Sequence, residues 1–172
     1  MQYTNTKKLT ITALFIAISF IGANVNLFGT IAFDSLPAFL AALLLGPWYG
    51  ATIGFLGHFF TALMSGFPLS LPLHLVIAAA MAITMLGFGF TYRLLINRVS
   101  QKLNFAITGA VGVLLNAPFS LSLSMVVLAF IAGREAAMGL LVMLPTLTLV
   151  SAANIIMAFA AFIVLRKVDN RP

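Results

Sequence analysis

The chain contains two histidines, His58 and His74, which are its strongest candidates for acid–base or ligand-binding chemistry. They lack the i, i+4 spacing of a helical metal pair and no third ligand stands out, so we expect no zinc or other metal site. His58 lies in an apolar segment, where an ionisable side chain usually faces the interior of a bundle, and it either fixes helix packing or contacts a ligand. His74 follows a proline-rich segment, and we expect it to contact a ligand.

Acidic residues are scarce: the chain has only Asp34, Glu135 and Asp169. Asp34 and Glu135 are expected in different loops, so the sequence does not indicate the paired carboxylates of a hydrolytic site. They are either solvated or capping charges, with Glu135 beside Arg134 at a helix start, or contacts for a ligand. If the ligand is an anion, Arg134 is the only cation on its side of the membrane. Cysteine is absent, which excludes disulfides and thiolate chemistry, and no cofactor is expected.

Two asparagines, Asn116 and Asn154, lie in long apolar runs. An amide in hydrocarbon needs a hydrogen-bond partner, so these side chains bond each other, bond backbone freed by nearby prolines, or reach a polar ligand. Asn26 lies in a polar segment near Asp34. It is either a turn residue, because Asn tolerates such backbone angles, or a further ligand contact.

The composition indicates an integral membrane protein of the all-α class. Of 172 residues, 62% are hydrophobic and 7% are charged, and the mean hydropathy is +1.15. A soluble domain is closer to half apolar and about a quarter charged. No glycine-rich loop ending in Gly-Lys-Ser or Gly-Lys-Thr occurs, so we expect ATP to be handled by a partner protein.

The elements that must position these residues form one transmembrane domain over residues 1–172. Six helices are expected near residues 9–23, 31–45, 51–64, 73–96, 105–131 and 137–165. The second is short for a hydrocarbon layer of about 30 Å and is expected to be broken or partly re-entrant. We expect a turn with interfacial aromatics at 46–50 and a structured loop at 65–72, because the loop contains two prolines.

The distribution of basic residues predicts the orientation. With six spans, both termini and the loop at 97–104 share one side, which is cytoplasmic by the positive-inside rule. Most of the lysines and arginines lie there: Lys7, Lys8, Arg93, Arg98, Lys102, Arg166, Lys167 and Arg171. The first residues resemble a signal peptide superficially, but we expect a retained first helix because no small-x-small cleavage site follows. The net charge of +6 then reflects topology and anionic lipid, and no nucleic-acid partner is expected.

Ala13 and Ala17 form a small-xxx-small pair on the first helix, with Thr10 one turn earlier on the same face. Small residues allow another helix to approach closely in lipid. The pair therefore either docks a partner protein or packs inside the bundle.

Together these features resemble the substrate-binding S components of energy-coupling factor (ECF) vitamin transporters. Ala13 and Ala17 match the family's first-helix AxxxA docking motif, and the runs at 32–38 and 45–47 match its Asp-Ser-x-Pro-Ala and Leu-Gly-Pro combination. The segments at 54–58 and 66–74 are similar to a subgroup linked to pantothenate or to cobalamin precursors such as α-ribazole. The resemblance extends over essentially the whole chain.

The resemblance implies a non-enzymatic binder in the bacterial plasma membrane that works with a transmembrane T component and two ATPases. Its pocket is expected to open outward between the loops at 24–34 and 65–74 and the last three helices. We expect Phe67, His74, Asn116 and Asn154 to line it. Two other classes remain open: an intramembrane enzyme with a histidine general base, which has no evident nucleophile, and a small channel-like protein.

Overall fold

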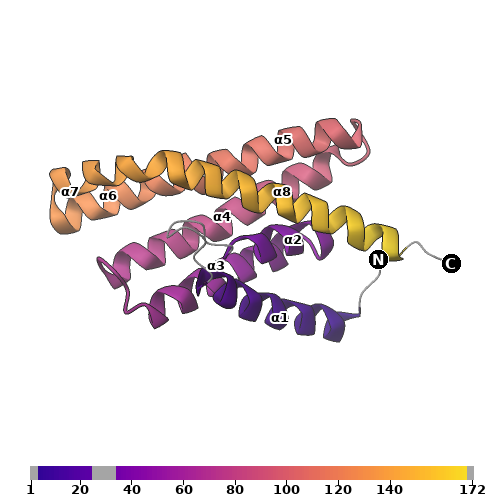
Figure 1. Cartoon of the computed structure of the whole chain (residues 1–172), viewed down its shortest axis with the longest axis horizontal. Helices are drawn as coiled ribbons and strands as arrows, with labels where there is room; N and C mark the ends of the chain where they lie inside the picture. The colour runs from indigo at the N-terminus through magenta and orange to yellow at the C-terminus, as the bar shows by residue number, and fades with distance from the viewer. Residues whose placement is uncertain (1–3, 25–33, 170–172) are drawn as a thin grey trace.

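The computed structural model describes residues 4–24 and 34–169, and this part of the chain is helical with no strands (Figure 1). The elements are α1 (Asn5–Asn24), α2 (Leu36–Leu44), α3 (Pro47–Met64), α4 (Leu71–Leu95), α5 (Gln101–Leu114), the π-helical turn η1 (Leu115–Phe119), α6 (Ser120–Ala132), α7 (Arg134–Gly139), the 3-10 turn η2 (Leu140–Met143) and α8 (Leu144–Asp169). The prediction of an all-α chain is confirmed for these residues.

Three stretches of the described chain are long and apolar enough to cross a membrane. They are Leu71–Leu95, Gln101–Ala132 and Arg134–Val168. The last two run through more than one element, because η1 joins α5 to α6 and η2 joins α7 to α8. The chain is thus an all-helical membrane protein, while six crossings and cytoplasmic termini stay predictions.

The start of α3 corrects one expectation. Residues 46–50 were expected to form a turn, but Pro47 begins α3 and Gly50 lies in its first turns. Proline suits the first helical position, because its φ is already helical and its missing N–H would have no partner there. Gly46 takes the strained angle at this junction, with φ at +120°, which a residue with a side chain adopts at a cost.

The helix α2 is short and central. Its nine residues span about 14 Å, too little to cross the hydrocarbon layer, which agrees with the expected broken segment. Its residues Pro37 to Leu43 are all buried, and the ring of Phe39 meets that of Phe88 on α4 edge-on at 4.8 Å. The rest of the expected 31–45 segment, residues 31–33, lies outside the described residues.

The basic residues gather at one end of the molecule. The start of α1, the end of α8 and the turn between α4 and α5 lie at the right of Figure 1, and α7 lies at the opposite end. The elements that start or end on the right contain Lys7, Lys8, Arg93, Lys102, Arg166 and Lys167, and Arg98 lies in the turn between α4 and α5. Arg171 lies outside the described residues. The main hydrophobic cluster is centred on α2 and includes residues of α3, α4 and α8.

Candidate functional site

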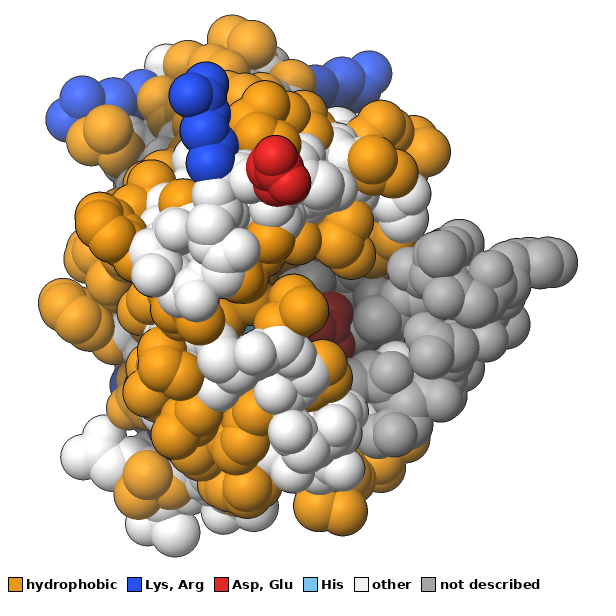
Figure 2. Space-filling view, turned by 90° about the vertical axis from the view of Figure 1, so that its left-hand side faces the viewer, with side chains coloured by type: hydrophobic (Ala, Val, Ile, Leu, Met, Phe, Trp, Pro, Cys, Tyr) orange, Lys and Arg blue, Asp and Glu red, His pale blue; other side chains and the backbone are white. Residues whose placement is uncertain are grey.

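A cavity of about 670 Å³ lies between the α3–α4 loop, α4, η1 with α6, and η2 with α8. Its apolar wall includes Leu73, Ile77, Met81 and Leu121. Its polar side chains are Asp34, Ser35, His58, His74, Asn116, Ser120, Ser124, Thr146 and Ser151. Figure 2 faces the end of the molecule where α7 lies and shows mostly hydrophobic side chains with few charged ones. The wall thus combines apolar area with a few convergent polar groups, as in small-molecule sites.

The two histidines meet at the cavity although they lie on different helices. Nε2 of His58 is 3.2 Å from Nδ1 of His74, and Nε2 of His74 is 2.8 Å from the carbonyl oxygen of Pro68. A carbonyl only accepts, so Nε2 of His74 donates to Pro68, while the donor in the contact between the two rings depends on their tautomers. Where Nδ1 of His74 accepts, Nε2 of His58 donates to it.

The loop after α3 is fixed by several contacts. Gly66, Phe67 and Leu69 all have positive φ angles, of +72°, +51° and +72°, a region that costs residues with side chains about 1 kcal/mol or more. The backbone N–H of Phe67 donates to Ala62 O at 2.8 Å. Its ring lies 6.1 Å from that of His74. Phe67 is not among the cavity-lining residues; it packs against His74 and supports the loop.

Asn116 lies on the π-helical turn and joins it to α8. Its Nδ2 donates to Ser151 Oγ at 3.1 Å, while its buried Oδ1 has no partner among the described residues. The turn occurs where Pro118 interrupts the helix, and such π-turns are frequent at functional sites. Asn154 donates to Val150 O at 2.9 Å, is fully buried and does not line the cavity. The side chains of Asn116 and Asn154 therefore do not hydrogen-bond to each other.

Asp34 and Ser35 bring the start of α2 to the cavity wall. Asp34 lies outside the three stretches that can cross a membrane, and burial raises the pKa of its carboxyl group while hydrogen bonds from Ser35 oppose that rise. Arg134 and Glu135 are exposed at the start of α7 and do not line the cavity, and Asn26 is outside the described residues.

Several cavity-lining alcohols were missed from the sequence: Ser120, Ser124, Thr146 and Ser151. Ser120 and Ser124 have the i, i+4 spacing that places two side chains on one helix face, which could have indicated them. They were overlooked because serine in an apolar helix commonly bonds its own backbone. Ser124 does so, since its Oγ donates to Ser120 O at 2.9 Å.

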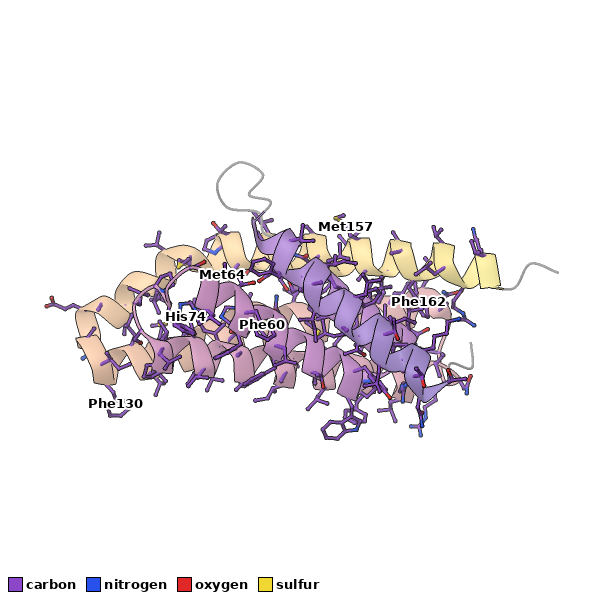
Figure 3. All side chains as sticks on the ribbon, turned by 90° about the horizontal axis from the view of Figure 1, so that it is seen from below. Phe60, Met64, His74, Phe130, Met157 and Phe162 are labelled. Carbon is purple, nitrogen blue, oxygen red and sulfur yellow. The ribbon has the colours of Figure 1, made fainter. Side chains whose placement is uncertain are left out.

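The small face of α1 is exposed. Ala13 and Ala17 line a groove of about 330 Å³ with Ile16, Phe20, Phe60 and Met64; Phe60 and Met64 are labelled in Figure 3 beside α1. The inward face of α1 carries other residues, because Thr12 and Ser19 are buried. Ala13 and Ala17 thus do not pack inside this chain.

Among the described residues, no group of three or more His, Asp or Glu side chains could hold a metal ion. A family model described as "ECF transporter, substrate-specific component" matches residues 7–166. No curated protein and no solved structure matches the chain.

Proposed function

The chain belongs to the family of substrate-specific components of ECF transporters, and from that premise we propose that it captures a water-soluble vitamin or vitamin precursor outside the cell. It delivers the compound together with a T component and two ATPases, in the bacterial plasma membrane. It performs no chemical reaction itself. The candidate ligands are α-ribazole, or a related cobalamin precursor, and pantothenate.

The cavity is the observation that carries this proposal. Its volume of about 670 Å³ falls within the range of pockets that hold small molecules, about 300 to 1,000 Å³. Its lining includes η2, which follows α7, and α7 lies at the end opposite most of the basic residues (Figure 1). The positive-inside rule therefore supports a mouth that opens outward.

Four of the candidate contacts belong to this wall: Asp34, His58, His74 and Asn116. We propose them as ligand contacts. Phe67 acts through His74, and Asn154 bonds the backbone of its own helix. Arg134 does not line the cavity and Asn26 lies outside the described residues, so their contact with the ligand stays a prediction.

The exposed small face of α1 supports a docking role. Ala13 and Ala17 are open to a neighbouring helix and lie on an apolar groove. Close approach of a second helix at small residues is a general means of association in lipid. We propose that the T component occupies this face.

The test separates binding from transport. The purified full chain in lipid nanodiscs is titrated with α-ribazole and with pantothenate, and uptake is measured in cells with and without the ATPase module. We expect saturable binding of one compound at one site by the chain alone, and uptake only with the module. Uptake by cells that lack every ATPase module would contradict the proposal.

A further inference from the structure

The described part of the cavity wall carries one acidic side chain, that of Asp34, and no Lys or Arg side chain. Arg134, the outward arginine, is exposed at the start of α7 and does not reach this wall. A carboxylate or phosphate in the cavity would therefore lose water without gaining a fixed positive partner, and it would meet a like charge.

The described polar groups of the wall also offer a ligand an acceptor that has no partner, while the amide nitrogen of Asn116 and Nε2 of both histidines are already used. Asn116 has committed its Nδ2 to Ser151, and its Oδ1 has no partner among the described residues. Nε2 of His74 is committed to the carbonyl of Pro68, and Nε2 of His58 to Nδ1 of His74, so neither atom is left to donate to a ligand. The oxygen of Asn116 therefore needs a donor from a ligand.

Asp34 strengthens the same conclusion. Hydrogen bonds from Ser35, the N-cap residue of α2, reach its carboxylate. The described residues of the wall give this carboxyl group no Lys or Arg partner, so a positively charged or strongly donating ligand group would stabilise its charged form.

Resting on the proposed function, we infer that the cavity selects uncharged or cationic compounds rich in N–H and O–H donors, and excludes carboxylates and phosphates. Asp34 and Asn116 accept from the ligand, and the leucines, Ile77 and Met81 cover its apolar part. Of the two candidate ligands, this favours α-ribazole over pantothenate.

Two matched pairs of probes test the charge preference directly. The first is α-ribazole against α-ribazole 5′-phosphate, and the second is panthenol against pantothenate, which differ by an alcohol in place of a carboxylate. Affinities are measured by titration of the full chain in nanodiscs. The uncharged member of any pair that binds should bind at least about tenfold more tightly. An anion that binds as tightly as its uncharged partner, or more tightly, overturns the inference.

Two variants connect this preference to Asp34. Asp34→Asn should reduce the ratio of affinities between the uncharged and anionic probes, because it removes the like charge. Glu135→Gln removes an exposed acidic group that does not line the cavity, and it should leave the ratio unchanged. Equal ratios in the wild type and Asp34→Asn would contradict the role of Asp34.

Mass spectrometry of compounds carried through purification separates this inference from the proposed function. A carried carboxylate or phosphate overturns the inference and leaves the binding function intact. A carried neutral or cationic donor supports both. A chain that carries nothing and binds none of the four probes contradicts the proposed function, and the inference fails with it.

Discussion

Nε2 of His58 lies 3.2 Å from Nδ1 of His74, so that α3 and α4 are joined at the cavity wall by two imidazole rings. The relation extends to the loop between these helices, because His74 also donates to the carbonyl of Pro68. One chain of hydrogen bonds thus ties the loop over the cavity to both helices. The pair gives this loop a defined position before any ligand arrives.

Removing the link from His74 should loosen the loop. In His74→Phe an aromatic ring remains, but the hydrogen bonds to Pro68 and His58 are lost. We therefore expect faster hydrogen exchange at residues 65–70 and a free energy of unfolding lower by about 1 kcal/mol. Thr52→Ala is the control, because it removes an exposed hydroxyl that bonds the backbone of its own helix. Unchanged exchange in His74→Phe would show that the loop is held by other contacts.

The loop should also respond to a bound compound. If it covers the cavity, a saturating probe that binds the chain, α-ribazole or panthenol, slows hydrogen exchange at residues 65–70, since Pro68 and Leu69 line the wall. The turn between α4 and α5 is at the other end and serves as the internal control. Exchange that is equal with and without the bound probe would argue against a lid.

A glycine pair tests the backbone strain of this loop. Gly66 has φ at +72° and Gly139 has an ordinary helical φ of −59°, and an added Cβ would meet no atom within 4 Å at either position. Gly66→Ala should therefore lose about 1 kcal/mol of unfolding free energy through backbone strain alone. Gly139→Ala should lose none, because alanine favours a helix. Thermal unfolding compares them, and equal stability would mean that the loop relaxes.

Much of this architecture could be predicted from the sequence. Long apolar runs predicted the helices around α4, α5 with α6, and α8, because length and hydropathy determine such segments. The pairing of His58 with His74 could not be predicted, since it depends on how α3 crosses α4. The number of residues between the two histidines does not determine the angle at which the helices cross.

The π-helical turn at Leu115–Phe119 escaped prediction for a related reason. Pro118 has no backbone N–H, so one carbonyl of the helix loses its donor. A kink, a break and a π-turn can each accommodate that loss, and the sequence does not distinguish between them. The turn determines which side chains reach the cavity. Asn116 was identified correctly as a polar residue that needs a partner, while its partner, Ser151, became visible only in three dimensions.

The small face of α1 should matter for transport and not for binding. Replacing Ala13 and Ala17 with Leu adds bulk at an exposed surface, so we expect lost association with the T component and lost uptake, at unchanged probe affinity. Ala106 and Ala110 on α5 have the same spacing and are also exposed, and replacing both with Leu is the matched control. If affinity falls together with uptake, or if the control variant loses uptake equally, the docking assignment is wrong.

The most direct measurement of the central claim blocks the cavity and counts the bound molecules. Ser124 is buried on the cavity wall and Ser122, two residues earlier, is exposed on the same helix. The full chain and the variants Ser124→Phe and Ser122→Phe are purified in nanodiscs, checked for folding by thermal unfolding, and analysed by native mass spectrometry. We predict one small molecule per chain for the wild type and Ser122→Phe, and none for folded Ser124→Phe. A folded Ser124→Phe that holds the same molecule would contradict the claim that this cavity is the binding site.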